Sequence, residues 1–526
     1  MSSNPHYNNP PADNAEDSDP DMLDEDDADE VLDAAGGDGD GDVAMGSDDE
    51  GDDGNEEILL QNDSIAYFDA HKDSVFAIAQ HPTYPNLVAT GGSEGDADDA
   101  PGKGYVVDTS AAASRPVLPA SYNSDPTPAQ STDLQPIFSI DGHTDSINAL
   151  AFTLPRGDYL ASGGLDGRLR VYGIAVNNAG AAQFKFVGES QETEEVNWLA
   201  PCPSAEYPNT LALGASDGSV WVFNIDAADL ANPIQIVQTY FLHTGPCTAG
   251  AWSPDGLLLA TVSEDSSLHV FDVWGSAAAK SLVTDNGQTV VSLTDADQRF
   301  AVQGGLYSVA IAPSSSFLAV GGAGGSVRII GLPRLSSPAA QTQQRTAASR
   351  RGGRAAASAV EPTNQAGAIL AALNVQQDGI ESLAFAPVPQ TLLAAGSVDG
   401  SIAVFDTARS FAVRKHIQGA HEGESVVKVE FVKSATSQPA AAGWLLTSCG
   451  LDGTVRRWDL RGATAGAAVA GGAAAAAAAA ASPLAKEWKG HRGGGEGGGV
   501  LGFVQGETGE RIVTAGDDSL VLLFEA

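Results

Sequence analysis

Histidines that recur with a hydroxyl residue and an aspartate are the side chains with the clearest potential for chemistry in this chain. Three sets share one order and similar spacing: His143, Ser162 and Asp166; His421, Ser448 and Asp452; His491, Thr514 and Asp518. Histidine, serine and aspartate are the groups of a nucleophilic catalytic triad. One active site would not be copied along a chain, so the repetition indicates structural hydrogen bonds. The sequence contains neither a glycine-rich phosphate loop nor a His/Cys metal cluster. We therefore predict a protein that is not an enzyme and has no cofactor or metal site.

The elements around Asp452 indicate three antiparallel strands. An alternating run, Val426 to Phe431, is followed by a second apolar run, Trp444 to Cys449. Asp452-Gly453 comes next, and then a third run that ends in Trp458-Asp459. Asp-Gly between two apolar runs predicts a hairpin, because both turn residues tolerate a positive φ. A Trp-Asp pair at the end of the third strand is typical of a WD-repeat propeller blade.

The same pattern recurs along the chain. Six further copies are Gly163–Tyr172, Gly214–Phe223, Val262–Phe271, Gly321–Ile330, Gly396–Phe405 and Ala515–Phe524. With the Asp452 unit and a weaker first copy at 90–95, the chain has eight units. A histidine precedes the first strand in five units, at His71, His143, His243, His421 and His491; the other three have Glu194-Glu195, Gly304-Gly305 and Gln377-Asp378 there. We predict an all-β, eight-bladed WD-repeat β-propeller, in which Asp63–Asp69 supplies the strand that the last unit lacks.

Charge and composition divide the chain. Residues 1–57 hold 22 of the 68 acidic residues and no Lys or Arg, and the whole chain has a net charge of −41. Such a segment cannot bury enough apolar surface to fold, so we predict a disordered acidic tail at 1–57. Residues 58–526 form the propeller, with low-complexity inserts at 96–133, 335–365 and 462–483.

The same features constrain the partners. A strongly acidic chain favours a basic protein or peptide as partner and disfavours direct contact with nucleic acid. Three cysteines without a CxxC pair fit a reducing compartment. The N-terminus has neither a basic region nor an apolar region, so we expect no signal peptide, and no apolar run is long enough to cross a membrane. We expect a cytoplasmic protein that does not bind membranes.

Propeller geometry predicts which residues meet a partner. Two positions in each blade lie on the face where the inner strands begin: an early residue of the first strand, and the residue before the turn aspartate. The first row reads Phe76, Asn148, Asn197, Thr248, Tyr307, Glu381, Val427 and Leu501, and the second reads Ser93, Leu165, Ser216, Glu264, Ala323, Val398, Leu451 and Asp517. From these rows and the acids before the strands, the candidate binding residues are Glu381, Asp517, Glu264, Phe76, Tyr307 and Glu195.

Several stretches outside the repeat consensus resemble one family. They are Asn62 to Pro82 (NDSIAYFDAHKDSVFAIAQHP), Gln191 to Pro201 (QETEEVNWLAP), Asp378 to Phe385 (DGIESLAF) and Ile512 to Glu525 (IVTAGDDSLVLLFE). The chain is similar here to fungal WD-repeat ribosome-assembly chaperones of the suppressor-of-QSR-truncations type, whose animal counterpart is the angio-associated migratory cell protein.

The resemblance implies a specific partner. Members of this family capture the basic N-terminus of the large-subunit ribosomal protein L-ten, often during its translation, and deliver it to the pre-60S particle. The resemblance further implies an acidic binding face, on which Glu381 and Asp517 match acidic positions. We expect a monomer. One departure from the family is a long insert where the first blade should have its third strand.

Three alternatives remain at this point. A WD-repeat histone chaperone or chromatin adaptor would also bind basic tails, but it should have a helix before the first blade. A substrate receptor of a ubiquitin ligase should carry a helical adaptor-binding motif. A propeller hydrolase would need an irregular carboxylate pair in its central funnel.

Overall fold

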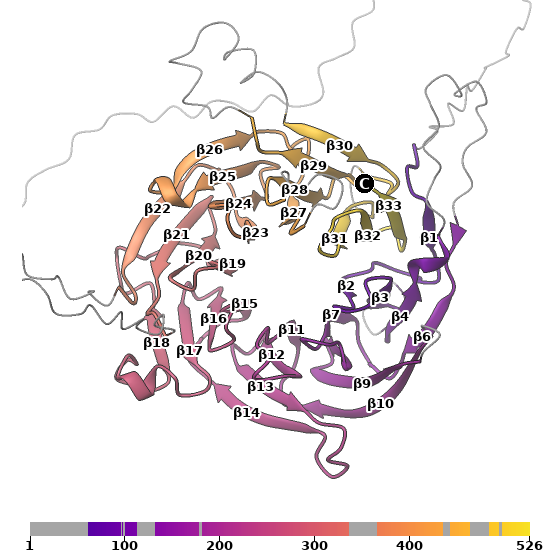
Figure 1. Cartoon of the computed structure of the whole chain (residues 1–526), viewed down its shortest axis with the longest axis horizontal. Coiled ribbons are helices and arrows are strands. Elements are labelled where there is room, and N and C mark those ends of the chain that lie inside the picture. The colour runs from indigo at the N-terminus through magenta and orange to yellow at the C-terminus, as the bar shows by residue number, and fades with distance from the viewer. Residues whose placement is uncertain are drawn as a thin grey trace, which may run out of the picture. The chain divides into compact units, whose positions relative to one another are not determined.

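A computed structural model shows a ring of sheets (Figure 1). It describes residues 61–95, 97, 100–112, 132–177, 181–335, 365–434, 442–462, 483–493 and 497–526. These residues form eight sheets, which we number as blades 1 to 8 along the chain. The predicted all-β, eight-bladed architecture is confirmed.

Each of blades 1 to 7 is a four-stranded antiparallel sheet. Blade 1 comprises β2 (Ala77–Gln80), β3 (Leu87–Ser93), β4 (Gly102–Asp108) and β6 (Pro136–Ile140). Blade 2 comprises β7 (Ile147–Phe152), β8 (Tyr159–Gly164), β9 (Arg168–Val176) and β10 (Ala182–Gln191). Blade 3 comprises β11 (Val196–Pro201), β12 (Thr210–Ala215), β13 (Val220–Ile225) and β14 (Ile234–Tyr240). Blade 4 comprises β15 (Cys247–Trp252), β16 (Leu258–Ser263), β17 (Leu268–Asp272) and β18 (Thr289–Leu293).

The second half of the ring repeats this plan. Blade 5 comprises β19 (Leu306–Ile311), β20 (Phe317–Gly322), β21 (Ser326–Gly331) and β22 (Ile369–Asn374). Blade 6 comprises β23 (Ile380–Phe385), β24 (Leu392–Ser397), β25 (Ile402–Asp406) and β26 (Ala412–Ile417). Blade 7 comprises β27 (Val426–Phe431), β28 (Leu445–Gly450), β29 (Val455–Asp459) and β30 (Leu484–Trp488). Three-residue 3-10 turns lie at Thr109–Ala111, Ala278–Lys280 and Thr407–Arg409.

The core lies between the blades. Every residue of β12 and of β24 is buried, because these second strands are covered by a neighbouring blade on each side. Between blades 7 and 8, Trp488 packs with Phe503 and Phe524, and all three side chains are almost fully buried. One sheet alone could not cover both of its apolar faces, so the ring depends on every blade.

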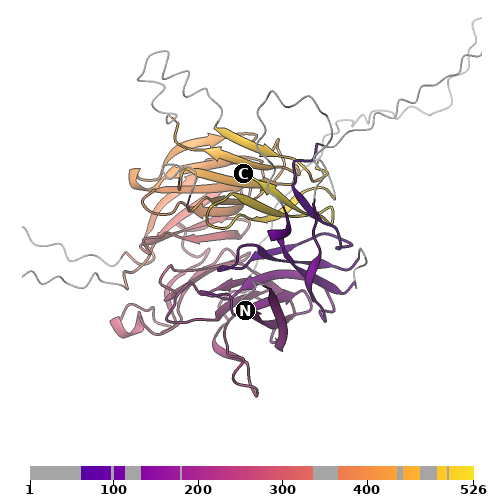
Figure 2. The same cartoon turned by 45° about the vertical axis from the view of Figure 1, so that its right-hand side comes forward.

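Blade 8 joins the two ends of the described chain. It comprises β31 (Val500–Val504), β32 (Arg511–Gly516), β33 (Val521–Glu525) and the first strand, β1 (Ala66–Phe68). β1 pairs antiparallel with β33, with Ala66 opposite Leu523. Figures 1 and 2 show the indigo start of the described chain beside its yellow end. The predicted closing strand is confirmed, and pairing here leaves β33 without an open edge. A short strand, β5 (Thr132–Asp133), adds to β1 in parallel.

One expectation about blade 1 is wrong. The range 96–133 is not only an insert, because it contains β4, the third strand that this blade was expected to lack. Two glycines of β4 are needed for close packing. A Cβ on Gly102 would lie 2.1 Å from the Asp145 carbonyl oxygen, and one on Gly104 would lie 2.8 Å from that of Thr90. The tail at 1–57 and nearly all of the inserts at 335–365 and 462–483 lie outside the described residues.

Within the described part of the chain, no helix has the length and apolarity to span a membrane.

Candidate partner-binding face

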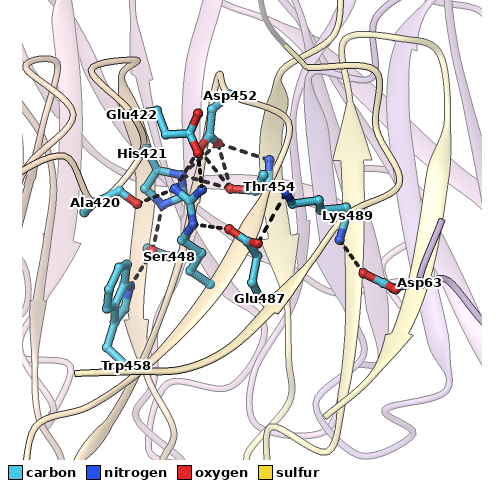
Figure 3. A network of polar contacts seen from close by, with 11 residues as sticks. Asp63, Ala420, His421, Glu422, Ser448, Asp452, Thr454, Trp458, Glu487 and Lys489 are labelled. Carbon is cyan, nitrogen blue, oxygen red and sulfur yellow. Dashed lines mark hydrogen bonds and ion pairs between the residues drawn. The ribbon is translucent and has the colours of Figure 1, made fainter. Parts of the chain in front are cut away.

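The recurring histidines hold the turns of the blades. In blade 7, His421 Nε2 lies 2.8 Å from Ser448 Oγ, and its Nδ1 lies 2.8 Å from Asp452 Oδ1 (Figure 3). Trp458 Nε1 donates to Ser448 Oγ over 2.8 Å, so the Ser448 hydroxyl is free to donate to His421 and the histidine donates to Asp452. His143 and His491 repeat this arrangement in blades 2 and 8. These residues stabilise turns, as the sequence predicted.

Blades 3, 5 and 6 lack this histidine, and in blades 6 and 3 another buried polar residue precedes the first strand. In blade 6, Gln376 is buried, and its Nε2 donates to the Ser401 carbonyl oxygen at 2.9 Å and to that of Ala395 at 3.2 Å. The sequence analysis placed this position one residue later and missed Gln376. In blade 3 the buried residue before the first strand is Thr193. Among the described residues, no cluster of His, Cys, Asp and Glu has the form of a metal site.

A β-bulge sets the first row of predicted face residues. In blades 2 to 8 the pairing register of the inner strand shifts at one residue near its start: Asn148, Asn197, Thr248, Tyr307, Glu381, Val427 and Leu501. A bulge leaves one residue outside the ladder and re-aims its side chain. These side chains are exposed or half-buried, while their neighbours Val196, Ile380 and Val426 are fully buried. In blade 1, Phe76 directly precedes β2 and is 42% exposed.

The second predicted row lies beside the first. The N–H of the residue before the turn aspartate donates to the carbonyl oxygen two residues before the bulge. Examples are Val398 to Gly379 and Asp517 to Gly499, both at 2.9 Å. The same bond recurs from Leu165, Ser216, Glu264, Ala323 and Leu451. The two rows therefore share one face of the ring.

Three of the six candidate residues form an acidic and aromatic cluster on blades 4 to 6. Burial, together with the charges of Glu264 and Glu381, raises the pKa of Tyr307 above its usual value. Burial and the neighbouring Asp378 also raise the pKa of Glu381. Neither Glu264 nor Glu381 forms an ion pair with a Lys or Arg of the described chain. This cluster therefore carries negative charge that no Lys or Arg of the described residues neutralises.

The other three candidates have different surroundings. Asp517 is held at the junction of blades 8 and 1, where its carboxylate accepts from Ser74 Oγ and, over 2.9 Å, from the Gly497 N–H. Phe76 follows Ser74 by two residues and lies at the same junction. Glu195 is exposed before β11, and its carbonyl oxygen accepts from the Ser216 N–H over 3.3 Å.

Three bulge residues are engaged by the ring itself. Asn148 Nδ2 donates to the Asn197 carbonyl oxygen (3.2 Å), and Asn197 Nδ2 donates to that of Cys247 (3.1 Å). Thr248 Oγ1 donates to the Leu306 carbonyl oxygen over 2.7 Å. These bonds join blades 2 to 5 in sequence. The sequence analysis did not foresee them; the run of amide and hydroxyl residues at one position was the available signal.

The connections that carry the three inserts start and end on the opposite face of the ring. In an antiparallel blade, the second-to-third turn and the link to the next blade lie on one face, and the other two connections lie on the opposite face. The connections β4–β6, β21–β22 and β29–β30, which carry the three inserts, are all of the opposite kind. The described residues on both sides of each insert therefore lie on the face opposite the bulge face.

The fold and the chemistry of this face define the class of protein. A family model for the WD domain, G-beta repeat, matches residues 134–173, 234–272, 298–330 and 367–406. A ring of WD-repeat blades with structural histidines, and with unneutralised carboxylates beside aromatic rings on one face, is a propeller suited to binding a basic protein.

The comparisons identify the family within that class. Sqt1 from Chaetomium thermophilum is 66% identical in its crystal structure, with a TM-score of 0.75, covering 89% of this chain and 100% of that one. The chain belongs to the Sqt1 family of ribosome assembly proteins, which is not an enzyme family. A second structure shows the Chaetomium protein bound to the N-terminus of ribosomal protein L10; it is 64% identical, with a TM-score of 0.74, and covers the same shares of both chains.

A curated relative agrees with this assignment. Ribosome assembly protein SQT1 of Saccharomyces cerevisiae is 28% identical over 264 residues, which make up 49% of this chain and 50% of the yeast protein. The match thus spans about half the length of that relative. The family favours ribosome assembly over the histone-chaperone and ubiquitin-ligase alternatives.

Proposed function

We propose that this protein is a non-enzymatic ribosome-assembly chaperone of the cytoplasm. As a monomer, it binds the basic N-terminal segment of newly made ribosomal protein L10 and delivers that protein to the pre-60S particle. The observation that carries the proposal is the cluster of Glu264, Tyr307 and Glu381, whose carboxylates have no cationic partner in the described chain. The proposal is supported by the Chaetomium Sqt1 structure with the N-terminus of L10.

The chemistry of the face explains why a basic segment suits it. Burial and Asp378 destabilise the charged form of Glu381, and a Lys or Arg of the partner beside it stabilises that form again. Tyr307 and Phe76 provide ring faces on which the aliphatic and cationic parts of such side chains can pack. Asp517, already fixed by Ser74, is held in place before a partner arrives.

Calorimetric titration with a synthetic peptide of the L10 N-terminal segment tests the proposal. Wild type is compared with Glu381→Lys/Asp517→Lys. The matched control is Glu206→Lys/Glu507→Lys, which makes the same charge change at exposed residues on loops of the opposite face. We expect the control to bind like wild type and the face variant to lose binding while its circular dichroism spectrum is unchanged. Equal binding by all three proteins would contradict the proposal.

A further inference from the structure

Blade 3 differs from other blades at the fourth residue after the turn aspartate. In blades 2 and 7 this residue is Arg170 or Arg456, and blade 5, whose turn has Gly324 instead of an aspartate, has Arg328 there. Blade 3 has Trp221, and blades 4, 6 and 8 have His269, Ala403 and Leu522. Arg170 pairs with Glu189 on the adjacent strand, and Arg456 pairs with Asp452 and, through Nε at 2.7 Å, with Glu487. In those two blades the protein's own guanidinium neutralises the acids of the rim.

The corner of blade 3 is aromatic and open. Phe241, just after β14, is 65% exposed, and its ring meets that of Trp221 at 87° with centroids 5.7 Å apart. Trp221 Nε1 donates to Ser219 Oγ over 2.9 Å, and the Ser219 N–H donates to Asp217 Oδ1 over 2.8 Å. Two perpendicular rings beside a carboxylate form a corner of the kind that binds ammonium and guanidinium groups.

Asp217 is available to a partner in a way that Asp452 and Asp518 are not. Asp452 and Asp518 accept hydrogen bonds from His421 and His491, and blade 3 has Thr193 instead of the histidine. Asp217 is exposed, and no cation of the described chain pairs with it.

The surrounding sector contains no cation that could fill this corner. From residue 186 to residue 279 the sequence has twelve Asp and Glu residues and no Lys or Arg. Glu192, Glu194 and Glu195, all exposed, precede β11 on the same face, and the Glu195 carbonyl oxygen is bonded to Ser216, next to Asp217. The corner is therefore continuous with the bulge face.

We propose that the corner of Trp221, Phe241 and Asp217 is a second docking point, which takes an arginine or lysine side chain of the basic client. The incoming cation neutralises Asp217, as Arg456 neutralises Asp452 in blade 7. This inference rests on the proposed function, since the client is the same basic protein. A client bound at both sites contacts the cluster of Glu264, Tyr307 and Glu381 and also blade 3.

Titrations with the L10 N-terminal peptide and the full chain test the corner. Phe241→Ala and Asp217→Asn should each weaken binding about three- to tenfold, whereas Phe241→Tyr should bind like wild type. The matched control is Leu230→Ala, since Leu230 is 91% exposed on the β13–β14 loop, which lies on the opposite face of the same blade. Affinities within twofold of wild type for both Phe241→Ala and Asp217→Asn would overturn the inference.

A nona-arginine peptide separates this inference from the proposed function. Even if the L10 peptide does not bind wild type, the corner predicts that nona-arginine changes the tryptophan fluorescence. That change should be reduced in Phe241→Ala and unaltered in Leu230→Ala. Identical fluorescence titrations for wild type and Phe241→Ala would reject the corner, whatever the result with L10.

Discussion

The two halves of the ring use the same bulge position for different purposes. In blades 2 to 4, Asn148, Asn197 and Thr248 donate hydrogen bonds to the next blade. In blades 5 and 6 the position holds Tyr307 and Glu381, which lie among other acids. In the first half this position joins neighbouring blades. In the second half blades 5 and 6 have a ring and a carboxylate there, which we propose bind a partner, whereas blades 7 and 8 have Val427 and Leu501. Identical backbone geometry therefore does not make every position on a propeller face a binding position.

The largest expected effect comes from reversing charge in the second half. Glu381→Lys should weaken L10-peptide binding about 30- to 1,000-fold, because it removes an attraction to the basic peptide and adds a repulsion. Thr248→Val, at the same position in blade 4, should stay within twofold of wild type. Calorimetry on both variants measures the contrast. Equal losses in the two variants would show that both halves bind.

Removing the acidic segment should affect the rate of capture only. A chain lacking residues 1–57 should associate with the peptide about tenfold more slowly at low salt, because 22 acidic residues no longer steer the encounter. Stopped-flow kinetics at low and physiological salt measures this. A large increase in the dissociation rate would mean that this segment holds the bound client, so that the face is not the whole site.

Removing a hydrogen bond between blades of the first half should lower the free energy of unfolding. Thr248→Val leaves the Leu306 carbonyl oxygen without this donor, and we expect a loss of about 1–2 kcal/mol in the free energy of unfolding. Val427→Thr, at the same position in blade 7, serves as the control and should change stability by less than about 0.5 kcal/mol. Urea unfolding of both variants and of wild type measures the two changes in stability. Loss of stability in Val427→Thr alone would reverse the assignment of the halves.

The smallest effect is on pH dependence. Because the pKa of Glu381 is raised in the folded protein, folding favours its protonated form, and stability from this group falls as pH rises through the raised pKa. Glu381→Gln should therefore be slightly more stable than wild type at pH 7, and the difference should vanish below the unfolded pKa of a glutamate. Binding of a cation favours the charged carboxylate, so wild-type affinity should fall on acidification and that of Glu381→Gln should fall less. Urea midpoints and titrations from pH 4 to 8 measure both.

Much of the ring could be predicted from the sequence, because local chemistry specifies it. Asp452-Gly453 can only turn tightly, Trp458-Asp459 ends a strand, and Asp63–Asp69 has the pattern of a fourth strand without a blade. The histidine positions followed from the same repeats. These features depend on residues that are close in sequence.

The remaining features depend on neighbouring blades. Gly102 and Gly104 stand in β4 because a side chain at either position would collide with the backbone of Asp145 or Thr90. Composition alone cannot show this close approach. Gln376 replaces a histidine by reaching Ser401 and Ala395. To tell which bulge residues bond to the next blade and which are left for a partner, one must know where the adjacent inner strand lies. The sequence therefore predicted the rows of the face but not which members are free.

Capture from cell lysate tests the central claim most directly. The tagged full chain, its Glu381→Lys/Asp517→Lys variant and the opposite-face control Glu206→Lys/Glu507→Lys are compared by quantitative mass spectrometry. The account predicts that ribosomal protein L10 is enriched with the wild type and the control and is lost with the face variant. Equal recovery of L10 by all three proteins, or enrichment of histones or ubiquitin-ligase subunits in its place, would contradict it.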